Sequence, residues 1–265
     1  MNKRELLTNT NTQLKIYKKG EETIIKYSII IPAFNEATRI LLTLQRITDY
    51  FTESGESFEI IVVDDGSTDS TADIVRRFSV SKDNIQYHTY ISNRGKGFAV
   101  RLGVEKARGV FILISDADLS SPIEELKKLT AFIDTGYDIA IGSRGLSESS
   151  ILKYQPFYRR TMGKIFNLFV RLFVLKGIRD TQCGFKVFTS SAAKKIFQRC
   201  RIDGFSFDVE ALFIAEHILK FKTKEVPIRW INSDGSRVNP IRHSSQMLRD
   251  LFVIRWNHFK GCYNT

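Results

Sequence analysis

VFILISDADLSSP, residues 110–122, is the stretch of sequence that most constrains the fold. Residues 110–115 form an apolar run with the length of a buried β-strand, and Asp116 and Asp118 follow it directly. Strands that are apolar on both faces are typical of parallel sheets covered by helices. Ligands of such sheets bind beyond the carboxyl ends of the strands. The stretch therefore predicts an α/β fold with a polar site at that edge of the sheet.

The same pattern continues on both sides of this stretch, from Tyr27 onward. Apolar runs with the composition of strands alternate with segments of helical periodicity. The expected strands cover residues 27–33, 58–63, 85–90, 110–115 and 137–141, and the expected helices cover residues 36–51, 70–78, 97–107 and 122–134. This alternation predicts a Rossmann-like, mostly parallel sheet flanked by helices.

The alternation ends after Arg144. Residues 151–176 mix apolar with basic side chains at helical spacing, which favours a helix lying in a lipid interface, although a helix packed on the core has a similar pattern. Beyond it we expect an irregular region at residues 180–188, helices at 191–198, 208–219 and 244–256, and a strand at 223–231. The C-terminal helices are thus expected to be amphipathic.

Charge and composition narrow the choice of partners. Forty Lys and Arg residues against 29 Asp and Glu give a net charge of +11, which favours polyanionic partners such as phosphorylated substrates or anionic lipids. Nucleic acid is not an expected partner, because the chain has no recognisable binding module or basic patch interleaved with aromatic residues. Neither a signal peptide nor an apolar run of the roughly 18–20 residues that span a bilayer is visible. Three cysteines without paired spacing indicate a reducing, cytoplasmic setting.

Asp116 and Asp118 form the most informative motif. Two carboxylates two residues apart can converge on one hard cation, whose other ligands would be phosphate oxygens and water. Such a cation stabilises the charge that develops on a departing nucleoside diphosphate. The alternative is an ordinary acidic turn in which Asp118 caps a later element. Because polar clusters also end neighbouring strands, we expect a Mg²⁺ or Mn²⁺ site here.

Three further polar clusters follow the first three expected strands. After the first, small residues and Asn35-Glu36 would let the backbone approach a planar base. After the second, Asp64 or Asp65 could accept hydrogen bonds from a ribose or a base; we favour Asp65, the other being a cap or turn residue. After the third, Lys96 and the backbone amides of residues 93–97 could hold a diphosphate, unless this loop is only a solvated turn.

Together these segments resemble one protein family. IIIPAFNE (29–36), VVDDGSTDST (62–71), NRGKGFAVRLG (93–103), SDADLSSP (115–122) and IGSRG (141–145) are similar to the motifs of the family 2 glycosyltransferases, inverting enzymes of the GT-A fold. DTQCGFKVF (180–188), FSFDVEAL (205–212) and DGSRVNPIRHSSQMLRDLFVIR (234–255) look like the dolichyl-phosphate β-glucosyltransferase branch. Eukaryotic members of that branch carry an N-terminal membrane helix that is not seen here. Related mannosyltransferases have Gln where this sequence has Ser120.

The resemblance implies roles for individual residues. Pro32, Ala33, Glu36 and Asp65 would hold the uridine part, Asp116 and Asp118 would reach the metal and diphosphate, and Arg144 and Arg237 would face the acceptor phosphate. Asp180, Asp208 and Glu210 fall where the family carries acidic residues near the reaction centre, so with Asp118 they are the catalytic candidates. The full set of candidates for nucleotide-sugar binding is Pro32, Ala33, Asn35, Glu36, Asp64, Asp65, Lys96, Asp116 and Ala117.

The resulting hypothesis is a metal-dependent transfer of a hexose, glucose in the leading case, from a UDP-sugar to a polyprenyl phosphate. The alternative is transfer to a saccharide hydroxyl, which would need Asp208 as a base. We expect a polar extension at residues 1–26, a nucleotide-sugar-binding half at 27–145, and an acceptor- and membrane-associating half of the same domain at 146–265. The protein is expected to be cytoplasmic, peripheral at the inner face of an anionic membrane.

Overall fold

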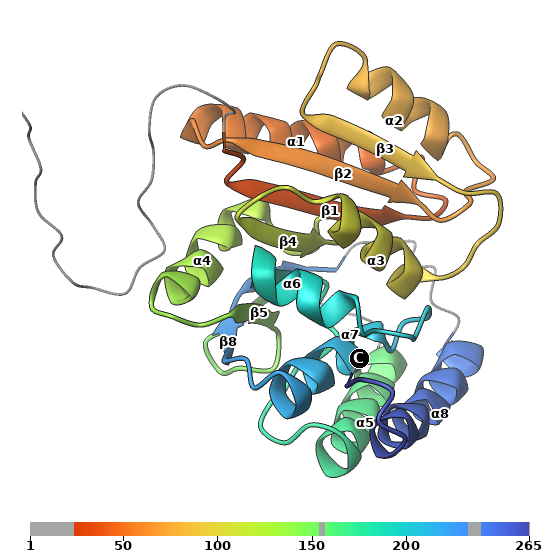
Figure 1. Cartoon of the computed structure of the whole chain (residues 1–265). Coiled ribbons are helices and arrows are strands. Elements are labelled where there is room, and N and C mark those ends of the chain that lie inside the picture. The colour runs from red at the N-terminus through yellow and green to blue at the C-terminus, as the bar shows by residue number, and fades with distance from the viewer. Residues whose placement is uncertain (1–23, 154–156, 233–239, 265) are drawn as a thin grey trace, which may run out of the picture.

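The computed structural model describes residues 24–153, 157–232 and 240–264. Its centre is a seven-stranded sheet with strand order β3-β2-β1-β4-β7-β5-β8 (Figure 1). Neighbouring strands pair in parallel, except that β7 runs antiparallel to both β4 and β5. The strands are β1 (Tyr27–Ala33), β2 (Phe58–Asp64), β3 (Ile85–Thr89), β4 (Phe111–Ser115), β5 (Ile139–Ser143), β7 (Phe185–Thr189) and β8 (Thr223–Pro227). The structure thus confirms the mostly parallel sheet.

Helices cover both faces of this sheet because its strands bury side chains on both sides. Ile29 and Ile31 of β1 pack into one core, whereas Ile30 between them packs into the other, as the alternation of side chains along a strand requires. The first core lies under α1 (Ile40–Ser54), α2 (Thr71–Ser79) and α4 (Leu126–Asp134). The second lies under α3 (Lys96–Lys106), α5 (Phe157–Phe173), α6 (Ser190–Phe197), α7 (Phe207–Phe213) and α8 (Pro240–Phe259).

Residues 180–188 correct one expectation, because they are not irregular throughout. Residues 185–189 form β7, which fills the position between β4 and β5. Lys186 interrupts the apolar run of this strand, although its side chain is buried. Because strands are predicted from runs of apolar residues, a charged residue inside a short segment prevents this strand from being predicted.

Other boundaries shift for local reasons. The first helix begins at Ile40 and not at Glu36, since Asn35 has a left-handed backbone with φ of +55° and the chain turns before the helix. The strand expected at 223–231 is two strands: β8 joins the main sheet, and β9 (Arg229–Ile231) pairs with β6 (Ser150–Lys153) in a separate two-stranded sheet. Residues 214–218 continue α7 as a π-helix.

The topology gathers the polar segments at one edge of the sheet. Ala33 pairs with Asp64, so β1 and β2 end side by side, and the residues after β4 follow at the same edge. Because β7 is antiparallel, its first residue, Phe185, pairs with the last residue of β4, Ser115. The residues just before β7 are therefore delivered to the edge at which the parallel strands end.

Candidate active site

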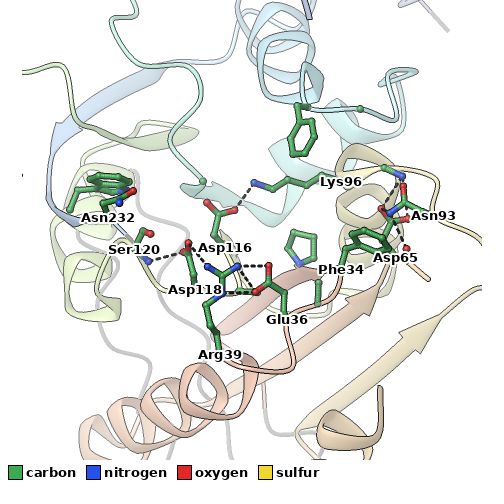
Figure 2. Close-up of a pocket in the computed structure, with 18 of the residues that line it drawn as sticks. Phe34, Glu36, Arg39, Asp65, Asn93, Lys96, Asp116, Asp118, Ser120 and Asn232 are labelled. Atoms are coloured by element: carbon green, nitrogen blue, oxygen red, sulfur yellow. Dashed lines mark hydrogen bonds and ion pairs between the residues drawn. The ribbon is translucent and has the colours of Figure 1, made fainter. Parts of the chain in front are cut away.

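A cavity of about 320 Å³ opens at this edge of the sheet (Figure 2). The sequence candidates that line it are Pro32, Ala33, Glu36, Asp65, Lys96, Asp116, Ala117, Asp118 and Arg144. Further lining residues that the sequence reasoning did not select include Phe34, Arg39, Ser120, Gly184, Phe205, Trp230 and Asn232. Asn35, Asp64, Asp180, Asp208 and Glu210 lie outside this lining, and Arg237 lies outside the described residues.

Asp116 follows β4 directly and forms an ion pair with Lys96 from the first turn of α3, with 2.5 Å between Nζ and Oδ1. Burial alone would raise the pKa of Asp116, but the neighbouring Lys96 outweighs it, so this pKa lies below its ordinary value. Gly184 packs directly against the carboxylate, because a Cβ there would come within 2.0 Å of Asp116 Oδ2. Any larger residue before β7 would therefore displace the carboxylate of the first acidic residue of the D-x-D motif.

Asp118 has a different cation beside it. Its Oδ2 lies 3.7 Å from Arg39 Nη1, and its Oδ1 accepts a hydrogen bond from the Ser120 backbone at 2.9 Å. Arg39 also binds Glu36 through two hydrogen bonds of 2.6 and 2.7 Å (Figure 2). Burial, together with the negative charge of Asp116, raises the pKa of Asp118. Arg39 lies three residues beyond Glu36, a spacing that could have indicated the pair from the sequence.

The two carboxylates suit a divalent cation. Within residues 24–153, 157–232 and 240–264, no third Asp, Glu, His or Cys completes a protein-only metal site. A hard cation bound to Asp116 and Asp118 would thus take its remaining ligands from the substrate and water, as cations bound with phosphates commonly do. The residues present fit that arrangement, and Lys96 and Arg39 lie beside the two carboxylates.

Asp65 is buried and organises the loop before α3. Its carboxylate accepts hydrogen bonds from the Tyr90 hydroxyl at 2.8 Å, from Asn93 Nδ2 at 2.9 Å, and from the backbone N–H groups of Arg94 at 2.6 Å and Gly95 at 2.9 Å. Desolvation raises the pKa of Asp65 despite these donors. Asp65 lines the cavity while it fixes the loop that carries Lys96.

The loop amides expected to hold a diphosphate are engaged within the protein. Arg94 and Gly95 donate to Asp65, and the N–H groups of Gly97 and Phe98 donate to the Asp203 carbonyl oxygen at 2.7 and 3.3 Å. This loop lines the cavity with Asn93, Gly95 and Lys96, and the Lys96 amine is the charged group among them. Of the backbone amides expected to contact phosphate, at residues 93–97, those of residues 94, 95 and 97 therefore do not match the geometry.

Asp64 and Asn35 fasten neighbouring loops together. Asp64 accepts hydrogen bonds from the Ser67 backbone at 3.0 Å and the Tyr87 hydroxyl at 2.8 Å. Asn35 accepts one from the Thr68 backbone at 2.8 Å, while its own N–H donates to the Ser67 hydroxyl at 2.9 Å. The contacts of Asn35 join the loop after β1 to the loop after β2, and those of Asp64 tie the end of β2 to its following loop and to β3. Both residues therefore hold loops next to the cavity without lining it.

Arg144 enters the cavity from the end of β5 with a fixed orientation. Asp180 accepts hydrogen bonds from its Nε at 2.7 Å, its Nη2 at 2.8 Å and its backbone N–H at 3.0 Å. Glu225 of β8 in turn accepts the backbone N–H of Asp180 at 2.8 Å. Burial would raise the pKa of Asp180, but the paired Arg144 outweighs it and the pKa is lowered. Asp180 therefore acts on the cavity by orienting Arg144.

Asp208 belongs to a second buried ion pair. Its Oδ1 lies 2.5 Å from Nζ of Lys186, which also donates to the Cys183 carbonyl. Both side chains are at most 5% exposed. Burial raises the pKa of Asp208, and Lys186 and Lys96 offset only part of that rise. Lys186 is a residue that the sequence reasoning missed, since a single Lys in a presumed loop gives no signal.

Comparison with known proteins adds a separate line of evidence. Residues 28–197 match the family model described as Glycosyl transferase family 2. A dolichyl-phosphate beta-glucosyltransferase from Drosophila melanogaster is 36% identical over 254 residues, covering 90% of this chain and 77% of its own. The Saccharomyces cerevisiae protein with that name is 34% identical and covers 94% of this chain and 79% of its own.

Solved structures extend the likeness to the fold. Mannosyl-3-phosphoglycerate synthase from Rubrobacter xylanophilus superposes with a TM-score of 0.64 at 17% identity, covering 89% of this chain and 75% of its own. Glucosyl-3-phosphoglycerate synthase from Mycobacterium tuberculosis, in complex with Mn²⁺ and UDP-glucose, gives 0.63 at 15% identity, covering 88% and 78%. At these identities the comparison confirms the GT-A arrangement expected from the sequence.

The contact between Gly184 and Asp116 yields a prediction. Gly184→Ala forces the Asp116 carboxylate away from its position, because a Cβ cannot share its space. We expect the affinity for Mn²⁺ and UDP together, measured by titration calorimetry, to fall by about tenfold or more, on the scale of a lost charge-assisted contact.

Gly163→Ala is the matched control. A Cβ at Gly163, on the exposed side of α5, meets nothing within 4 Å. Its affinity should equal that of the wild type. Equal affinities in Gly184→Ala and the wild type would show that the position of Asp116 does not govern binding.

Proposed function

Because this chain belongs to glycosyl transferase family 2, we propose that it transfers a hexose, glucose in the leading case, from a UDP-sugar to the phosphate of a polyprenol with inversion at the anomeric carbon. The chain is a glycosyltransferase similar to the dolichyl-phosphate beta-glucosyltransferases over about nine-tenths of its length. The observation that carries the proposal is that Asp116, Asp118 and the oriented Arg144 line one cavity. The two aspartates that would bind the sugar donor through a metal ion thus face the same cavity as Arg144, whose guanidinium would bind the acceptor phosphate.

The donor would lie along the wall made by the ends of β1, β2 and β4. Pro32, Ala33 and Asp65 line the part of the cavity where the uridine would lie. Asp116 and Asp118 would hold a Mg²⁺ or Mn²⁺ ion, which when bound stabilises negative charge on the diphosphate. Lys96 would contact the same diphosphate, since its amine already lies beside Asp116. Arg39 is a further cation at this end of the cavity.

The acceptor would bring its phosphate to Arg144. Asp180 occupies one edge of the guanidinium, so Arg144 is held in one orientation while the rest of the planar fork can face the cavity. A phosphate oxygen would attack the anomeric carbon, the bond from that carbon to the UDP oxygen would break, and UDP would leave from the opposite face. The new glycosyl–phosphate bond then has the inverted configuration.

Asp208 is not needed as a base in this reaction. A phosphate monoester has a second pKa near about 6, so the acceptor is largely dianionic at neutral pH and carries no proton to remove. Asp208 also lies outside the cavity lining and pairs with Lys186. Its geometry supports an orienting role, in which Asp208 holds the Lys186 amine against the backbone that precedes β7.

An apolar surface on α5 and α8 would meet the membrane. The two helices pack against each other (Figure 1). The ring centroids of Phe173 on α5 and Phe252 on α8 lie 6.3 Å apart. The large apolar side chains exposed on them are Phe157, Ile165, Leu168, Phe169, Leu172, Phe173, Phe252, Trp256 and Phe259. Exposed basic residues accompany them: Lys164, Arg171, Arg249, Arg255 and Lys260.

Such a mixture of aromatic and basic residues suits a helix pair lying in the interface of an anionic bilayer. Among the described residues, no helix is long and apolar enough to cross a membrane. Peripheral contact at the cytoplasmic face would place the cavity near the headgroups, where a polyprenyl phosphate is found. This interpretation gives a use to apolar area that would otherwise be exposed to water.

The reaction is tested by transfer of label from UDP-glucose to an organic-extractable product, with purified protein, a polyprenyl phosphate and Mg²⁺ or Mn²⁺. We expect label in the lipid phase and its loss when a chelator is added. Consumption of a different UDP-sugar would change the donor assignment alone. Transfer only to a saccharide hydroxyl would overturn the acceptor assignment and favour a polysaccharide or glycolipid product.

The role of Asp208 is tested by the pH profile of Asp208→Asn. If Asp208 orients the site, kcat/KM falls moderately, and the loss of activity below about pH 6 remains, because it follows the second pKa of the acceptor phosphate. Loss of activity by many orders of magnitude, together with loss of that acidic limb, would identify Asp208 as a base. Thermal unfolding of the variant reports the separate cost of leaving Lys186 unpaired.

The membrane contact is tested with Phe252→Glu and sedimentation with anionic phosphatidylglycerol vesicles. Removing an exposed phenylalanine and adding a negative charge should weaken vesicle binding by about tenfold or more. Val80→Glu is the matched control, since Val80 is also 68% exposed but lies just after α2 and not on α5 or α8. Equal vesicle binding by both variants would show that α5 and α8 do not form the membrane-binding surface.

A further inference from the structure

Glu210 is a fully buried carboxylate that has no task in the proposed chemistry. Its Oε2 accepts hydrogen bonds from the backbone N–H groups of Arg201 at 2.9 Å and Ile202 at 2.8 Å. Its Oε1 accepts a hydrogen bond of 2.8 Å from the hydroxyl of Tyr263, which is also fully buried. Losing one of these donors would leave part of a desolvated charge unsatisfied. Glu210 thus ties residue 263 to residues 201–202.

Further hydrogen bonds join residues 199–201 to residues 262–263. Arg199 Nε donates to the Tyr263 carbonyl oxygen at 3.1 Å, and Arg201 Nη2 donates to the Cys262 carbonyl oxygen at 3.0 Å. The aromatic ring of Tyr263 packs in the same core as α7 and α8. Residues 199–202 are therefore held by the segment that follows α8.

The inner side of this segment lies against the start of α3. The Asp203 carbonyl oxygen accepts the N–H groups of Gly97 at 2.7 Å and Phe98 at 3.3 Å. A Cβ at Gly95 would lie 2.4 Å from the Asp203 oxygen, and one at Gly97 would lie 2.4 Å from the Ile202 oxygen. The backbone of residues 202–203 packs against that of residues 95–98 without space between them. A shift of residues 201–203 must therefore move the start of α3.

Lys96 lies between these two glycines and carries the amine beside Asp116. We propose that Glu210 and Tyr263 are positioning residues for donor binding: by fixing residues 201–203 they set where α3 begins and where the Lys96 amine meets a diphosphate. The inference rests on the proposed function, because it takes Lys96 to contact the diphosphate of a UDP-sugar. It gives Glu210 a role that acts through Lys96 and not through contact with the substrate.

The test is the affinity for UDP in the presence of Mn²⁺, measured by titration calorimetry on the full chain, with thermal unfolding measured in parallel. Tyr263→Phe removes only the hydroxyl that Glu210 binds. Ser28→Ala is the matched control, because the Ser28 hydroxyl also donates to a fully buried glutamate, Glu59, at 2.6 Å. Ser28 lies near the start of β1, at the sheet edge opposite the cavity.

We expect Tyr263→Phe to raise the dissociation constant of UDP by about two- to thirtyfold, the range seen for residues that couple to a site without touching its ligand. Ser28→Ala should lower the unfolding temperature and leave UDP affinity at the wild-type value. In Glu210→Gln, affinity should also fall, and adding Tyr263→Phe should cause little further loss, because either change removes the charge-assisted hydrogen bond between Tyr263 and Glu210.

Unchanged UDP affinity in Tyr263→Phe, or an equal loss in Ser28→Ala, would overturn the positioning role and leave Glu210 as a stabilising residue only. A wild-type protein that binds no UDP under these conditions would instead overturn the proposed donor, and this inference would fall with it. The wild-type titration therefore separates the two failures.

Discussion

Lys96 and Asp116 carry opposite charges on atoms 2.5 Å apart in the lining of the cavity, and the loop before α3 and Gly184 hold them there. Two aspartates separated by one residue repel each other in a partly desolvated site, which makes their joint ionisation costly. Lys96 offsets that cost at Asp116, and Arg39 offsets it at Asp118. The start of α3 and the residue that precedes α1 are consequently bound to the segment after β4 by electrostatics as well as by packing.

Two further ion pairs lie away from the part of the cavity assigned to the sugar donor. Arg144 is paired with Asp180, and Lys186 with Asp208, so each cation near the cavity has its own carboxylate. A buried ion pair contributes little net stability, because desolvation of both charges cancels much of their attraction. Its value here is orientation. Asp180 fixes the plane of the Arg144 guanidinium, and this decides the direction from which a phosphate can approach.

Features that depend on hydrophobic periodicity and on the residues at strand ends could be predicted from the sequence. It predicted the strand–helix alternation, the sheet edge that carries the site, and residues such as Asp65, Asp116 and Arg144 that line the cavity. It could not reveal Lys186 or Gly184, whose importance comes from partners distant in sequence: Asp208 for one and Asp116 for the other. Glu210 shows the converse limit, since an acidic residue in a recognisable motif turned out to hold backbone N–H groups away from the cavity.

The position of β7 has a consequence for how the chain folds. β4 and β5 are close in sequence, but they are not neighbours in the sheet, because residues 185–189 lie between them. During synthesis, the first 145 residues can pair β1, β2, β3 and β4, whereas β5 must wait for a strand about 40 residues further along, and loop closure over that distance slows folding. Until then the backbone N–H and C=O groups along one edge of β4 are unpaired, and such edges can form a β-ladder with another chain, which leads to aggregation. A break near residue 145 would therefore divide the sheet itself, because β7 and β8 come from the second half of the sequence.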